Sequence, residues 1–224
     1  SGDDLVQDIT HCGTCHTPRT PTMGMDTDKA FSGGDLGSWV AFNITPDKNA
    51  GIGNWSQQDL VTYLKTGFVA GKASASGAMS EAIEHSLQHL SDDDLNAIAT
   101  YIRSVPAISD DKQSKPRDAW GQQDRDVYPL RAEGQTIDQS AAALFNASCA
   151  ACHGKGGEGS GEGFHAYPSL FSHTSTGSYD NRNQVSVILN GVQRHMDKGE
   201  IMMPSFANQL NDEQIATLSN YVSK

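Results

Sequence analysis

The chain has 224 residues, of which 37% are hydrophobic, and it carries a formal net charge of −11. The acidic excess argues against nucleic acid and anionic membrane surfaces as partners. No apolar run reaches the ~18 residues of a membrane span, so we expect any association with a membrane to go through partner proteins.

In the first half, a short helix is predicted over residues 5–9, directly before Cys12-Gly13-Thr14-Cys15-His16. A middle helix is predicted over residues 56–65, where Gly67 ends it. The last helix of this half begins at Ser91, which can cap its amino terminus ahead of three aspartates. Apolar residues then recur at helical spacing along it.

The second half repeats this order. A helix is predicted over residues 140–147, directly before Cys149-Ala150-Ala151-Cys152-His153. A middle helix over residues 183–189 is ended by Gly191. The final helix is capped by Asn211, and acidic residues follow in its first turn.

No segment alternates with strand period, so the sequence predicts an all-α protein. Two elements of organisation follow from the repeat: residues 1–105 form a first domain and residues 140–224 a second, each near the usual size of a small domain. The segment 106–139 is rich in proline, glycine and charge and is interpreted as a connector.

Both halves contain the pattern Cys-x-x-Cys-His, and the two copies use every cysteine of the chain: Cys12, Cys15, Cys149 and Cys152. This pattern is the attachment signature of covalent haem c, in which two thiols bond the porphyrin edge and the adjacent histidine ligates the iron. Zinc sites, disulfides and redox dithiols share the spacing of the cysteines but do not need the histidine. We therefore predict two covalently attached haem c groups, with His16 and His153 as iron ligands.

A second axial ligand decides between electron transfer and catalysis. In the second half we predict Met203, because Pro204 favours extended backbone at that position and the final helix follows shortly afterwards. Met202 is the neighbouring alternative. A backbone carbonyl should hold the ring N–H of each histidine, and that of Pro168 is the candidate for His153.

In the first half we predict Met79, since Met23 and Met25 lie too close to His16 in sequence to reach the opposite side of the porphyrin. His85 and His89 are the competing ligands, because residues four apart share one face of a helix. The sequence indicates no carbonyl partner for His16.

Several runs of the first half are specific enough to compare with a known family: Cys15-His16-Thr17-Pro18-Arg19, Phe31-Ser32-Gly33-Gly34, Asn43-Ile44-Thr45-Pro46 and Glu84-His85-Ser86-Leu87-Gln88-His89-Leu90. With Met202-Met203-Pro204-Ser205-Phe206 in the second half, they resemble the multihaem cytochrome c subunit of bacterial membrane-associated alcohol and gluconate dehydrogenases. The resemblance implies class I cytochrome c domains and axial roles for Met79 and Met203. Family members usually carry three haem motifs, and the two present here match the second and third. The chain is then either a natural dihaem relative or a piece of a longer protein.

We therefore expect a dihaem electron carrier rather than an enzyme, either alone or as a subunit of a dehydrogenase complex. The resemblance implies a dehydrogenase as electron donor, and quinone or a respiratory-chain cytochrome or oxidase as acceptor. Covalent attachment of haem takes place outside the cytoplasm, so we expect a periplasmic protein in mature or trimmed form. The rival interpretation is a dihaem enzyme, peroxidase-like or thiosulfate-oxidising, with one open haem site.

Overall fold

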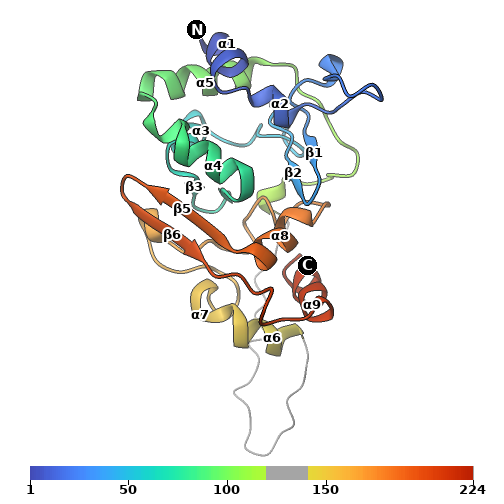
Figure 1. Ribbon diagram of the computed structural model, residues 1–224, viewed down its shortest axis with the longest axis vertical. Helices are drawn as coiled ribbons and strands as arrows, with labels where there is room; N and C mark the ends of the chain where they lie inside the picture. The colour runs from blue at the N-terminus through green and yellow to red at the C-terminus, as the bar shows by residue number, and fades with distance from the viewer. Residues whose placement is uncertain (120–140, 224) are drawn as a thin grey trace, which may run out of the picture.

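The computed structural model describes residues 1–119 and 141–223. The first of these ranges forms the upper part of the molecule in Figure 1 and the second the lower part. The helices and strands of the first range are α1 (Gly2–Asp4), a π-helical turn (Leu5–Ile9), α2 (Cys12–His16), β1 (Gly34–Leu36), β2 (Trp39–Ala41), α3 (Gln57–Thr66), β3 (Phe68–Val69), β4 (Ala73–Ser74), α4 (Gly77–His85) and α5 (Asp92–Ser104), with short 3-10 turns at Thr27–Lys29, Leu87–His89 and Arg117–Ala119. Those of the second range are α6 (Ala141–Ser148), α7 (Ala150–His153), a 3-10 turn (Gly163–His165), α8 (Arg182–Asn190), β5 (Val192–Met196), β6 (Gly199–Met203) and α9 (Asp212–Val222).

The predicted helix starts are confirmed by the side chains that cap them. Ser91 accepts a hydrogen bond from the amide of Asp94 at the start of α5, and Asn211 accepts one from Gln214 at the start of α9. Ser56 caps α3 in the same way, and Gly67 ends that helix in the left-handed conformation. These short-range bonds satisfy amides that a helix cannot pair internally.

The prediction of an all-α protein is wrong. The described residues contain three two-stranded antiparallel sheets, which pair β1 with β2, β3 with β4, and β5 with β6. Four of these strands are only two or three residues long, too short to show an alternating pattern. The β5–β6 hairpin is longer, with Val192 opposite Met203 and Met196 opposite Gly199. Part of this hairpin is buried against other polar groups, so some of its inward-facing residues are polar or charged. The alternation of apolar and polar residues that marks a strand is therefore not visible in its sequence.

This hairpin lies between the two halves in Figure 1, where β5 contacts α4. The hydrophobic core cluster of the first half includes the fully buried side chains of Ile83, Leu95 and Ile98. In the second half α6 and α9 pack together, with the rings of Phe145 and Tyr221 5.5 Å apart. None of the helices in residues 1–119 and 141–223 is long and apolar enough to cross a membrane.

The predicted connector, residues 106–139, is described only up to residue 119; the rest of it, with Trp120, lies outside the described residues. Its described part contacts both halves, and Gln113 bonds the backbone of Gly177 and Tyr179. Asn43 and Thr45 bond the backbone of Ile108, and Arg117 is buried with its guanidinium 4.6 Å from the centre of the Phe42 ring. These contacts bring a buried cation close to the first haem motif.

Candidate haem sites

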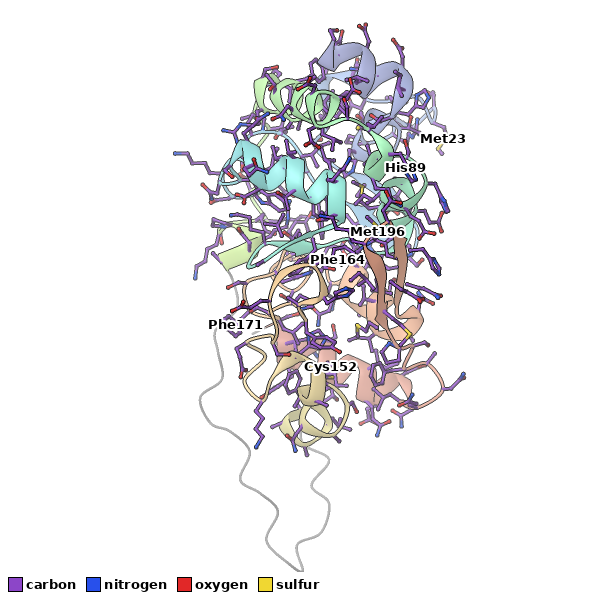
Figure 2. All side chains as sticks on the ribbon, turned by 90° about the vertical axis from the view of Figure 1, so that its left-hand side faces the viewer. Met23, His89, Cys152, Phe164, Phe171 and Met196 are labelled. Carbon is purple, nitrogen blue, oxygen red and sulfur yellow. The ribbon has the colours of Figure 1, made fainter. Side chains whose placement is uncertain are left out.

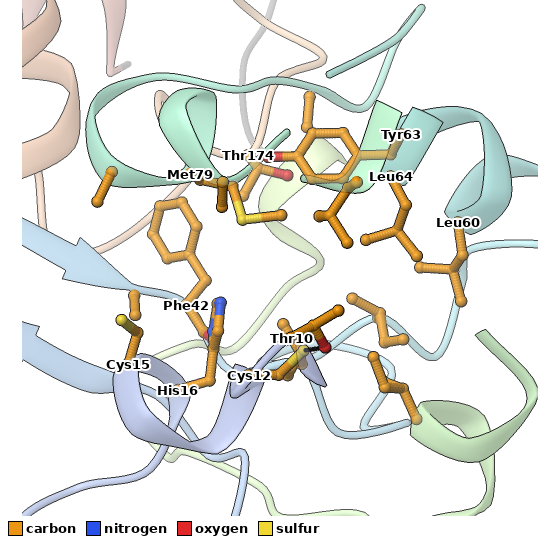
Figure 3. A pocket seen from close by; sticks show the side chains of 18 of the residues that line it. Thr10, Cys12, Cys15, His16, Phe42, Leu60, Tyr63, Leu64, Met79 and Thr174 are labelled. Atoms are coloured by element: carbon orange, nitrogen blue, oxygen red, sulfur yellow. Dashed lines mark hydrogen bonds between the residues drawn. The ribbon is translucent and has the colours of Figure 1, made fainter. Parts of the chain in front are cut away.

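A cavity of about 370 Å³ lies in the first half between α2, α3 and α4. Figure 3 shows Cys12, Cys15 and His16 on one side of it and Met79 pointing into it from the opposite side. Apolar side chains from α3 form a wall between them, including Leu60 and Leu64. The structure thus brings the predicted attachment residues and the predicted axial methionine of the first half into one cavity.

His16 is held by the backbone. Its Nδ1 donates a hydrogen bond to the carbonyl oxygen of Phe42, with the two atoms 2.6 Å apart. A carbonyl can only accept, so the proton sits on Nδ1, and Nε2 keeps the lone pair that a metal ligand needs. Burial lowers the pKa of His16, and the nearby Arg117 guanidinium lowers it further against the opposing effect of the Phe42 carbonyl. A neutral, oriented imidazole results, which is the form that binds iron.

Met79 lies on α4, close to the start of that helix. Trp39 packs there: a Cβ on Gly77 would lie 2.7 Å from the Trp39 ring, so glycine at this position lets the indole approach the helix. Met79 is half-buried against the hydrophobic cluster, whereas His85 and His89 are exposed and are not part of the cavity lining. Met23 is also largely exposed. Of these competing residues, Met79 alone lines the cavity.

The second half of the chain helps to close this first cavity. Thr174, Ser175 and Asn183 belong to its lining. Thr174 donates from its amide and its hydroxyl to the carbonyl oxygen of Lys72, at 2.8 and 3.0 Å. The first site is therefore built by both halves, which the repeat in the sequence does not indicate.

The cavity has the character that a porphyrin requires. Its lining is mostly apolar and includes the aromatic rings of Trp39, Phe42 and Tyr63. All four cysteines are free, and no cluster of three or more metal-ligating side chains occurs among residues 1–119 and 141–223. Burial also raises the pKa of the Cys12 thiol. The residues fit a large apolar group bonded through paired thiols and do not fit a structural zinc site.

The histidine of the second motif is held in the same way as that of the first. His153 on α7 is buried, and its Nδ1 donates to the carbonyl oxygen of Pro168 at 2.9 Å, as predicted from the sequence. Burial lowers the pKa of this histidine and raises that of Cys149 to about 11. The ring is again neutral, with Nε2 left to act as a ligand.

Met203 is the last residue of β6, where side chains alternate between the two faces of the hairpin. Met203 is half-buried, while its neighbour Met202 is 66% exposed. Gly191 ends α8 with a positive φ of 72°, and a Cβ there would lie 2.4 Å from the carbonyl oxygen of Met203. Only glycine lets the strand that carries Met203 pass this close to the helix.

Sequence reasoning missed three contributions to these sites. The carbonyl of Phe42 lies 26 residues beyond His16, and no residue type marks a backbone acceptor. Arg117 and Arg194 are both buried, although charged residues are usually exposed. Arg117 lies beside the ring of Phe42, and Arg194 lies beside Gly67. These neighbours are far away in the sequence, so their presence could be recognised only in the folded structure.

Comparison with known proteins shows which proteins the chain is similar to. Residues 139–224 match the protein family described as Cytochrome c. The chain is 43% identical to the fructose dehydrogenase cytochrome subunit of Gluconobacter japonicus, over 99% of its own length and 47% of that relative. It is 34% identical to the gluconate 2-dehydrogenase cytochrome c subunit of Pantoea cypripedii, over 99% of its own length and 50% of the relative. It is 30% identical to the cytochrome c subunit of alcohol dehydrogenase (quinone) of Gluconobacter oxydans, over 100% of its own length and 46% of the relative.

The chain thus spans about half the length of the relatives it matches. The resemblance expected from the sequence motifs is confirmed. Cytochrome c subunits are electron-transfer components rather than the catalytic parts of dehydrogenases, so the comparisons support a role in electron transfer. We conclude that the chain is homologous to the cytochrome c subunits of fructose, gluconate and alcohol dehydrogenases and contains a cytochrome c domain, which implies covalently attached haem c.

Proposed function

We propose that this protein is a dihaem c-type cytochrome that carries electrons from a periplasmic dehydrogenase towards quinone or the respiratory chain. The observation that carries the proposal is the first cavity, in which thiols and His16 face Met79 from opposite sides. Haem c, when bound, supplies a one-electron ferric/ferrous couple. A protein donor on each side of the cavity supports electron transfer at this site.

The residues of each half have defined roles in this proposal. Cys12 and Cys15 attach the first haem, and His16 and Met79 ligate it. The Phe42 carbonyl fixes the ring of His16, and the α3 side chains exclude water. In the second half Cys149 and Cys152 attach the haem, and His153 and Met203 ligate it. The Pro168 carbonyl fixes the ring of His153.

We also propose that the two haems occupy separate domains, residues 1–105 and 140–224, joined by residues 106–139. The homologous relatives supply the class of donor, a dehydrogenase for a sugar, a sugar acid or an alcohol. Because covalent haem attachment takes place outside the cytoplasm, the proposed location is the periplasm. The net charge of −11 suits a redox partner with a basic or mixed docking surface.

Intact mass and the ferric spectrum test the proposal together. The holoprotein should carry two haems, and Met79→Ala and Met203→Ala should each remove about half of the methionine-to-iron charge-transfer band. Met202→Ala is the matched control, and because this side chain is largely exposed it should leave the band intact. A mass corresponding to one haem, or a full band in either of the first two variants, would contradict the proposal.

A further inference from the structure

Arg194, on β5 of the hairpin, is fully buried at 0% exposure. It comes from the second half of the chain but lies inside the first. Figure 2 places Met196, two residues further along the same strand, at the boundary between the two halves, and Met196 packs against the hydrophobic cluster of the first half. The hairpin therefore inserts an arginine beside the hydrophobic cluster of the first half.

The guanidinium of Arg194 contacts the segment that leads into α4. Its NH1 nitrogen donates to the carbonyl oxygen of Ala75 at 2.6 Å and lies 3.5 Å from the hydroxyl of Ser80. That hydroxyl itself donates to the Ala75 carbonyl at 2.9 Å. Ser80 directly follows Met79, so Arg194 bonds both ends of the turn that presents the methionine.

The first half is shaped to receive this side chain. A Cβ on Gly67 would lie 2.8 Å from Nε of Arg194, so the guanidinium occupies the space that a larger residue would fill. The amide of Ala75 donates to the Gly67 carbonyl at 2.7 Å, which closes the pocket from the other side.

The Nε of Arg194 is buried and has no hydrogen-bond partner, and the carboxylate that acts on its charge is that of Glu84 on α4. Burial lowers the pKa of Arg194, while Tyr63 and Glu84 oppose that effect. Replacing a buried charge with an apolar group of similar size is often neutral or stabilising. Retaining an arginine here therefore has a cost to folding, which points to a benefit elsewhere.

The hairpin is fixed on α4 by further bonds on either side of Arg194. The amide of His195 donates to the carboxylate of Glu84 at 3.0 Å. The side-chain nitrogen of Gln88 donates to the backbone carbonyl of His195, and the side-chain oxygen of Gln88 accepts from the backbone amide of Asp197 at 3.0 Å. The position of Arg194 relative to α4 is thus set by these three hydrogen bonds as well as by its own side chain.

We propose that Arg194 is a positioning residue of the first haem site, which holds the Ala75–Ser80 turn that presents Met79 and raises the reduction potential of that haem by its buried positive charge. This inference rests on the proposed function. A cation buried near an iron disfavours the ferric state, which carries one more positive charge than the ferrous state. The second half of the chain would then set the potential of the first haem, and the order in which the two haems are reduced would depend on contact between the halves.

Potentiometric titration of the holoprotein tests this, with the first haem identified as the wave that changes in Met79→Ala. In Arg194→Met we expect a lower potential for that haem, by about a tenfold change in its reduced-to-oxidised ratio at fixed ambient potential, or about 59 mV for one electron. The second wave should not move. Lys198→Met is the matched control, since it removes one positive charge from an exposed position of the same hairpin and should shift neither wave.

Arg194→Lys and Arg194→Gln separate charge from hydrogen bonding and replace Arg194→Met if that variant does not fold. Both can donate to the Ala75 carbonyl, but only lysine keeps the charge. The potential should fall in the glutamine variant and stay near the wild-type value in the lysine variant. Equal potentials in Arg194→Gln, Arg194→Lys and Lys198→Met would overturn the inference. A wild-type protein without two haems would instead overturn the proposed function.

Discussion

Asn183 joins the two halves through a pair of hydrogen bonds to one residue. Its side-chain oxygen accepts from the amide of Val40 at 2.7 Å, and its side-chain nitrogen donates to the carbonyl of Val40 at 2.8 Å. Asn183 is buried on α8, and Val40 lies on β2 in the first half. In Asn183→Ala both backbone groups lose their partner inside the interface. At about 1–3 kcal/mol for each of the two unsatisfied groups, we expect a loss of about 2–6 kcal/mol in the free energy of unfolding.

Urea denaturation of the oxidised holoprotein measures this loss. Asn190→Ala, at the exposed carboxyl end of the same helix, is the matched control and should change stability by less than about 0.5 kcal/mol. Asn183→Asp keeps the acceptor for the Val40 amide but sets a carboxylate against the Val40 carbonyl, so it should be no more stable than the alanine variant. If Asn183→Ala and Asn190→Ala unfold at the same urea concentration, the pair does not hold the halves together.

Two further predictions concern the β5–β6 hairpin and the residues next to it. Gly191→Ala should displace Met203 and remove about half of the methionine-to-iron band, because its Cβ would lie 2.4 Å from the Met203 carbonyl. The control is Gly71→Ala: Gly71 has a similar φ of 70°, but a Cβ there would have no atom within 4 Å, so this variant should keep the whole band. Equal spectra for the two variants would refute the argument. The backbone amide of His195, more than its side chain, lowers the pKa of Glu84, against the effect of burial. A lowered carboxyl pKa stabilises the folded state above the ordinary glutamate pKa, and that stabilisation is lost as the pH falls through the lowered value. The stability difference between wild type and Glu84→Gln should therefore shrink from about pH 6 to about pH 3, and a difference independent of pH would count against this contact.

The helices and their ends could be predicted because their determinants are local. Ser56, Ser91 and Asn211 each bond an amide three residues away, and such caps are visible in any short window of sequence. The haem motifs are local for the same reason. The Pro168 carbonyl, 15 residues from His153, is the one hydrogen-bond partner of a haem-motif histidine that the sequence predicted.

The rest depends on contacts between distant parts of the chain. Arg194 and Ala75 are 119 residues apart, and Asn183 and Val40 are 143 apart. No local pattern indicates that the middle helix of one half packs on a strand of the other, or that a hairpin strand buries a cation. The two- and three-residue strands follow from these contacts as much as from strand propensity, which explains why period alone did not reveal them.

Carbon monoxide binding to the fully reduced protein at neutral pH tests the central claim most directly, because the ligand adds only to an iron with an open or weakly held position. With His16 and Met79 on one haem and His153 and Met203 on the other, we predict no stoichiometric adduct in the wild type. Met79→Ala should bind about one carbon monoxide per chain and so shows that the assay detects an open site. A wild-type adduct of one or two per chain would contradict the account and would require a reaction at the open iron.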